Sequence, residues 1–169
     1  VEVIDIGICG TEEIYFHTFN RTGIFDSKSI GGGIMVTASH NPKGYNGLKI
    51  VANDARPLSK DEIQELKKAA QSANFAEPKK EGKITYSNRL SSYTHYLMKH
   101  FNNSQEKKLR ILVNPGNGPA NKIIREVERK LPYDFYKILA EYDGDFPHGV
   151  PNPMLIENRK ITANAVIEC

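Results

Sequence analysis

Along the chain, short apolar runs alternate with longer stretches in which apolar residues recur every three or four positions. The apolar runs occupy residues 1–8, 34–38, 48–51, 109–113 and 134–139. Runs of this length, bounded by glycine, proline and asparagine, are typical of β-strands. We therefore expect strands spread over the whole chain, with helical segments between them, and we expect the strands at 34–38 and 48–51 to be buried.

The helical spacing is strongest where a start signal precedes it. Ser59 and Glu62 have the three-residue spacing of a capping box, and Thr11 can cap the helix that it opens. Apolar residues then follow at intervals that place them on one helix face. These signals predict helices over residues 11–19, 59–73, 90–101, 119–131 and 156–168.

The polar segment 102–108 has no apolar pattern and divides the chain, so we predict domains at residues 1–103 and 104–169. Segment 74–87 is also polar and is expected to be a surface connection. After residue 108 a strand, a glycine-rich turn, a helix and a strand follow in order. This βαβ order predicts parallel strands and places the chain in the α/β fold class.

A strongly shaped loop lies between the runs 34–38 and 48–51. It contains three consecutive turn signals, namely Asn41-Pro42, Lys43-Gly44 and Asn46-Gly47. Loops held by a rigid scaffold often carry binding and catalytic groups. Ser39 and His40 stand at the entry of this loop, which makes it the first candidate site.

The residues in and beside this loop can also be interpreted without a catalytic role. Ser39 and His40 are neighbours, and on extended chain their side chains would point in opposite directions, out of the hydrogen-bond reach that a nucleophile and its base need. Alternation along a strand directs Lys49 away from the face that Leu48 and Ile50 fill. Its ammonium therefore lies either in water on an edge strand or beside an anionic partner. Lys43 is expected to be solvated.

Two further motifs each have a structural and a functional reading. Gly116-Asn117-Gly118 follows a strand and could hold a phosphate at a helix N-terminus, but it lacks the third glycine of a dinucleotide fingerprint. A tight turn is the favoured reading. Asp143 and Asp145 could be metal ligands, although acids in a loop rich in glycine and proline are more often turn residues.

Composition narrows the function classes. The 169 residues carry a net charge of only +3, and the lysines and arginines are scattered, so we expect no nucleic-acid partner. The two cysteines, Cys9 and Cys169, show no spacing pattern and are expected to be reduced thiols of a cytoplasmic protein. We found no apolar run of membrane-spanning length and no signal-like start, so no membrane partner is expected.

Residues 37–49, Thr-Ala-Ser-His-Asn-Pro-Lys-Gly-Tyr-Asn-Gly-Leu-Lys, resemble the phosphoserine signature of the α-D-phosphohexomutases. The similarity covers nearly the whole chain and is greatest to bacterial phosphomannomutases. It implies two small three-layer α/β/α units with mixed sheets, corresponding to incomplete domains 1 and 2 of that family. The implied activity is interconversion of mannose 6-phosphate and mannose 1-phosphate through a phosphoserine and a hexose 1,6-bisphosphate.

The resemblance also assigns roles. Ser39 would carry the phosphoryl group, His40 beside it would act as a hydrogen-bond donor or an acid/base group, and Lys49 would stabilise charge and assist proton transfer. Asn41 and Lys49 would contact the hexose phosphate substrate. Mg²⁺ would bind an oxygen of the Ser39 phosphate, its aspartate ligands lying in a family loop expected after Cys169. The chain alone is therefore expected to be inactive.

Several alternatives stay open. The substrate preference could be for glucose phosphates or for both sugars, since the family selects the sugar in a domain outside residues 1–169. The chain could also be a non-catalytic α/β module that binds sugar phosphates. The sequence leaves the oligomeric state undecided.

Overall fold

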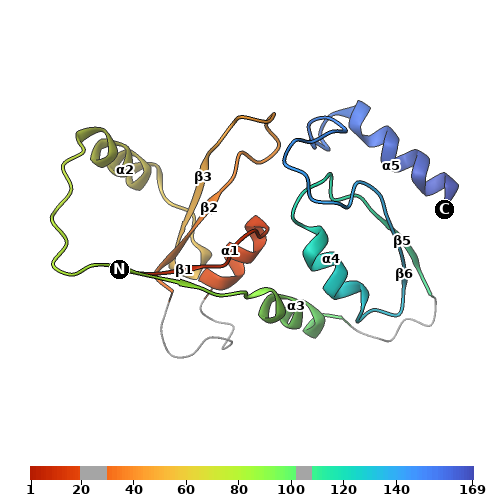
Figure 1. Cartoon of the computed structure of the whole chain (residues 1–169), viewed down its shortest axis with the longest axis horizontal. Helices are drawn as coiled ribbons and strands as arrows, with labels where there is room; N and C mark the ends of the chain where they lie inside the picture. The colour runs from red at the N-terminus through yellow and green to blue at the C-terminus, as the bar shows by residue number, and fades with distance from the viewer. Residues whose placement is uncertain (20–29, 102–107) are drawn as a thin grey trace. The chain divides into compact units, whose positions relative to one another are not determined.

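The computed structural model describes residues 1–19, 30–101 and 108–169, and these form an α/β protein (Figure 1). The fold class is thus as predicted. The chain divides into two compact units, one formed by Val1–Met35 and Lys49–Arg89, the other by Val36–Leu48 and Leu90–Cys169. The predicted boundary between residues 103 and 104 falls in a segment outside the described residues and stays a prediction.

A parallel pair of strands joins distant parts of the first unit. Strand β1 (Glu2–Asp5) pairs with β4 (Lys83–Tyr86), with Val3 opposite Ile84. The first strand was predicted, but β4 lies in the segment predicted to be only a surface connection, and that prediction was wrong. The four residues of β4 alternate polar and apolar side chains, a pattern too short to stand out from its polar surroundings.

The core of the first unit lies where helix α1 (Thr11–Thr18) meets the hairpin of β2 (Gly32–Val36) and β3 (Leu48–Ala52). Phe16 and Val51 are buried here. A Cβ on Gly33 would approach the methyl groups of Ile14 and Thr18 to 2.6 and 2.8 Å, so the strand needs glycine at this contact. The short helix η2 (Asn53–Ala55) packs against α1.

Two local predictions need correction here. Gly10, not Thr11, is the N-cap of α1, and its N–H donates to Glu13 Oε1 at 2.9 Å. The strands β2 and β3 form as expected, but the prediction that their apolar residues are buried was wrong for Val36 and Leu48, which are 69% and 63% exposed. Alternation turns only one face of the hairpin towards α1, and both residues lie on the other face.

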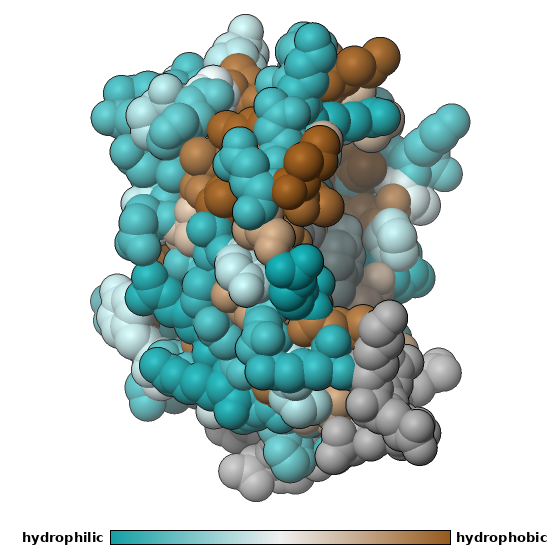
Figure 2. Space-filling model, turned by 90° about the vertical axis from the view of Figure 1, so that its right-hand side faces the viewer, coloured by the Kyte–Doolittle hydropathy of each residue, from teal (hydrophilic) through white to brown (hydrophobic). Residues whose placement is uncertain are grey.

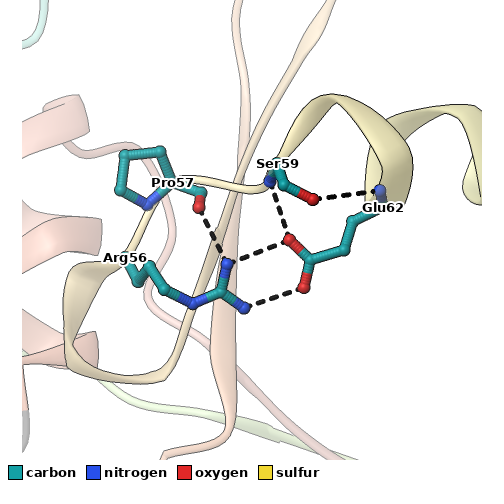
Figure 3. A network of polar contacts seen from close by, with 4 residues as sticks. All are labelled: Arg56, Pro57, Ser59 and Glu62. Atoms are coloured by element: carbon teal, nitrogen blue, oxygen red, sulfur yellow. Dashed lines mark hydrogen bonds and ion pairs between the residues drawn. The ribbon is translucent and has the colours of Figure 1, made fainter.

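Helix α2 (Lys60–Ser72) begins with the predicted capping box (Figure 3). Glu62 N–H donates to Ser59 Oγ at 3.2 Å, and Ser59 N–H donates to Glu62 Oε2 at 2.7 Å. The Arg56 guanidinium donates to both Glu62 oxygens at 2.9 and 2.8 Å, and together with the Ser59 bonds it lowers the pKa of Glu62 to about 2. Ile63, on the apolar stripe of α2, is exposed.

The second unit contains the predicted βαβ motif. Helix α4 (Asn121–Glu128) connects strands β5 (Arg110–Val113) and β6 (Asp134–Lys137), which are parallel. Helix α3 (Leu90–Lys99) packs against α4, and α5 (Ile156–Glu168) contacts β5. Four of these five elements begin within one residue of their predicted starts, and α4 begins two residues later, after a turn that contains Pro119.

Part of the surface of the second unit is apolar (Figure 2). On α5, Ile156, Val166 and Ile167 are all exposed, because apolar residues are distributed around this helix and only one side meets β5. Among the described residues, we found no helix with the length and apolar character needed to cross a membrane. Cys9 is buried, Cys169 is half-buried, and neither forms a disulfide.

Candidate active site

The signature loop presents an exposed serine in an unusual backbone conformation. Ser39 has a φ of 58°, in the left-handed region that few residues other than glycine adopt. Its Oγ lies 3.1 Å from His40 Nδ1, within hydrogen-bond distance. The expectation that these neighbours point apart was therefore wrong, because it assumed extended chain and the chain turns at Ser39.

Four further hydrogen bonds hold the loop around Ser39. Thr37 Oγ1 accepts from Ser39 N–H at 2.9 Å. The backbone N–H and Nδ2 of Asn41 both donate to the Ala38 carbonyl, at 3.1 and 2.8 Å. Thr37 N–H donates to the Gly47 carbonyl at 2.9 Å and closes the hairpin below the turn. These bonds fix the segment that carries the serine.

Lys49 lies on β3, exposed, and on the same strand face as buried Val51. Among the residues that the structure describes, its side chain has no hydrogen-bond or ion-pair partner, so its ammonium is open to solvent. Ser39, His40 and Asn41 belong to the hairpin tip that is counted with the second unit, whereas Lys49 belongs to the first. The structure thus brings Ser39, His40 and Asn41 together, and the role of Lys49 stays a prediction.

Lys43, which was expected to be solvated, is exposed but forms an ion pair. Its Nζ lies 2.6 Å from Asp145 Oδ1, and hydrogen bonding and charge attraction from Asp145 raise the pKa of Lys43. Asp143 Oδ1 accepts from Asp145 N–H at 2.9 Å. The two acids are therefore turn residues, and Asp145 additionally contacts the signature loop.

Gly116-Asn117-Gly118 could bind a phosphate only if its backbone N–H groups were free to donate hydrogen bonds to it. Gly116 N–H donates to Asn114 Oδ1, Asn117 N–H to the Leu139 carbonyl and Gly118 N–H to the Pro115 carbonyl. Because all three amides already have protein acceptors, none is available to an anion. The segment is a close-packed turn, the reading favoured from the sequence.

Within residues 1–19, 30–101 and 108–169, the structure contains no group of three or more His, Cys, Asp or Glu side chains that could bind a metal ion. The donors of these residues alone thus do not fit a resident Mg²⁺. The one donor that the resemblance assigns to the metal is an oxygen on Ser39, once that serine is phosphorylated.

Thr37 was not singled out as a site residue from the sequence. The signal that could have found it is its position two residues before Ser39. A Ser or Thr hydroxyl often bonds the N–H two residues later in a turn.

Comparison with known proteins covers both units. The sequence models of the α/β/α domains I and II of phosphoglucomutase/phosphomannomutase match residues 1–77 and 91–168. A family structure from Burkholderia thailandensis aligns with 95% of this chain at a TM-score of 0.81 and 26% identity, using 34% of its own length. A putative phosphomannomutase from Thermus thermophilus has the same fold, with a TM-score of 0.70 at 19% identity over 98% of this chain and 36% of its own.

Curated relatives are more similar in sequence. Proteins named phosphohexose mutases in Xanthomonas campestris and phosphomannomutase in Vibrio cholerae are 43% and 39% identical over 99% of this chain. The chain spans 36% of the length of each. With both domain models matched along most of its length, the chain belongs to the phosphoglucomutase/phosphomannomutase family.

Proposed function

We propose that this chain supplies the phosphoryl-carrying serine of a phosphohexomutase, and that the enzyme interconverts mannose 6-phosphate and mannose 1-phosphate. The observation that carries the proposal is the exposed Ser39 Oγ, presented on a fixed turn within 3.1 Å of His40 Nδ1. Phosphoryl transfer depends mainly on positioning and charge neutralisation, and this arrangement supplies the first.

In the proposed reaction, the bond between phosphorus and Ser39 Oγ breaks while a bond forms to the free hydroxyl of the hexose phosphate. The sugar hydroxyl releases one proton to water and Ser39 Oγ gains one from His40, so the step is balanced. His40, whose Nδ1 lies 3.1 Å from Oγ, supplies that proton and takes one back when the second phosphate of the bisphosphate returns to Ser39. Lys49 offers an ammonium charge to the transferred group, and Asn41 fixes the loop and contacts the substrate.

In this proposal, the phosphate on Ser39 is the one Mg²⁺ ligand that the described residues would supply. A phosphate on the exposed Oγ would offer oxygen ligands of the kind that Mg²⁺ prefers, and the ion would neutralise charge there. The remaining ligands would have to come from residues other than those described. None of the proton and phosphoryl steps above depends on these ligands.

Mannose phosphate is proposed as the first substrate because the relative from Vibrio cholerae is named phosphomannomutase. Glucose phosphates are the competing substrates, since the relatives from Xanthomonas campestris carry the wider name phosphohexose mutases. Parallel assays with mannose 1-phosphate and glucose 1-phosphate, compared by kcat/KM, decide between the two.

The proposal is tested by the mass of the protein purified from cells that make it, before and after phosphatase treatment. We expect one phosphoryl group, mapped to Ser39, that phosphatase removes and that exchanges with the phosphate of added hexose 6-phosphate. Ser39→Ala should abolish it, whereas Ser91→Ala, at an exposed helix serine, should not. A phosphate on another residue, or binding of hexose phosphate without transfer, would refute the mutase and favour the non-catalytic binding module.

A further inference from the structure

The left-handed backbone conformation of Ser39 requires a structural explanation. A left-handed conformation is unfavourable for serine because its Cβ crowds the neighbouring carbonyl oxygen. The φ of 58° therefore persists only where surrounding bonds enforce it. Ser39 is exposed, so core packing does not provide that constraint.

Among the described residues, two side chains bond the peptide group between Ala38 and Ser39: Asn41 Nδ2 donates to its carbonyl, and Thr37 bonds its N–H. Thr37 Oγ1 lies 2.9 Å from Ser39 N and accepts its N–H. Thr37 is itself anchored, because its own N–H donates to the Gly47 carbonyl on the opposite side of the hairpin. Its β-branched side chain has few rotamers, so the hydroxyl is held at a defined position relative to the turn.

We propose that Thr37 is a positioning residue, whose hydroxyl selects the left-handed conformation of Ser39 and thereby brings Oγ to His40. The conformational part stands on the geometry alone, and the catalytic consequence rests on the proposed function. Thr37 does not touch the reacting atoms. It acts through the serine, by keeping the nucleophilic oxygen on the side of the turn where His40 Nδ1 lies.

Three variants separate this role from general stability. Thr37→Val keeps the shape and the branch of the side chain but removes the hydroxyl, and Thr37→Ser restores the hydroxyl. Ser72→Ala is the matched control, because Ser72 Oγ accepts from Asn74 N–H two residues later, at the end of α2 and in the other unit. The control removes the same kind of bond far from Ser39 in sequence.

The first measurement is the strength of the NMR cross-peak between the amide and α protons of Ser39 in the 169-residue chain, which is strongest when φ is positive. A net hydrogen bond of ordinary strength predicts that Thr37→Val lowers the ratio of left-handed to other conformers roughly fivefold. Thr37→Ser and Ser72→Ala should match the parent chain. An unchanged Ser39 cross-peak in Thr37→Val would overturn the proposal.

The second measurement is steady-state turnover of hexose phosphate by the enzyme that contains this chain. Thr37→Val should lower kcat about fivefold with KM within twofold, and Thr37→Ser should restore kcat. Equal losses in Thr37→Val and Ser72→Ala, or a loss in KM alone, would contradict the positioning role. Failure of phosphate to map to Ser39 would instead refute the proposed function and leave the conformational result standing.

Discussion

The stability of the first unit should fall in mildly acidic solution because of one buried histidine. His17, on α1, is only 6% exposed and its ring meets that of Phe16 edge-on at 4.9 Å between centroids. Burial, and next the nearby positive charge of Arg89, lower the pKa of His17 to about 4. Protonation of this imidazole is therefore much easier in the unfolded chain than in the folded one.

The direction and size of the effect follow from proton linkage. Between pH 6.5 and pH 4 the unfolded chain binds more protons than the folded chain, so the free energy of unfolding decreases as the pH falls. The contribution of His17 is intact above pH 6.5. From the shift in pKa, about 2 kcal/mol is lost by pH 5 and about 3 kcal/mol by pH 4.

We expect this loss in urea unfolding followed by circular dichroism at pH 7.5 and pH 5. His17→Gln should reduce the difference between the two pH values to below about 0.5 kcal/mol, since it removes the shifted group. His95→Gln, at an exposed position on α3, should leave the difference unchanged. The low pKa of Glu62, caused first by Arg56, matters only below pH 4.5 and so does not affect this window.

The explanation fails if the His17 ring proton titrates with a midpoint near 6.5 in NMR spectra of the folded chain. It also fails if His17→Gln and the parent chain lose equal stability between pH 7.5 and pH 5. Either result would mean that burial and Arg89 do not disfavour the charged ring.

Two smaller changes test the local packing. Ser59→Ala removes the N-cap of α2 and should lower the helix signal of that segment, at a cost of about 1 kcal/mol in urea unfolding, whereas Ser91→Ala should cost nothing measurable. Gly116→Ala should destabilise the second unit by about 2 kcal/mol, because φ is +59° and the new Cβ would lie 2.9 Å from Pro151 Cβ. Gly44→Ala, also at positive φ but with no atom within 4 Å, should cost less; equal losses at both glycines would refute the packing argument.

The sequence predicted which segments are regular because that information is local. The capping box of Ser59 and Glu62 and the βαβ order after residue 108 both appear as expected, since each depends on residues a few positions apart. Burial is a property of distant partners, and here the predictions were weaker. Val36 and Ile63 belong to correctly predicted elements, yet both are exposed, because no described segment covers the faces on which they lie.

The candidate site shows the same division between local and distant information, with one instructive exception. The turn signals located the loop, and the family signature named Ser39, but the relation between Ser39 and His40 was predicted wrongly although they are adjacent. Alternation assumes extended chain, and a single positive φ at Ser39 reverses the direction of its side chain relative to His40. The residue that we hold responsible for that φ, Thr37, is also local. A hydroxyl two positions before a reactive serine is therefore a sequence feature from which the geometry of such a site can be predicted, and the Thr37→Val and Thr37→Ser pair tests that rule directly.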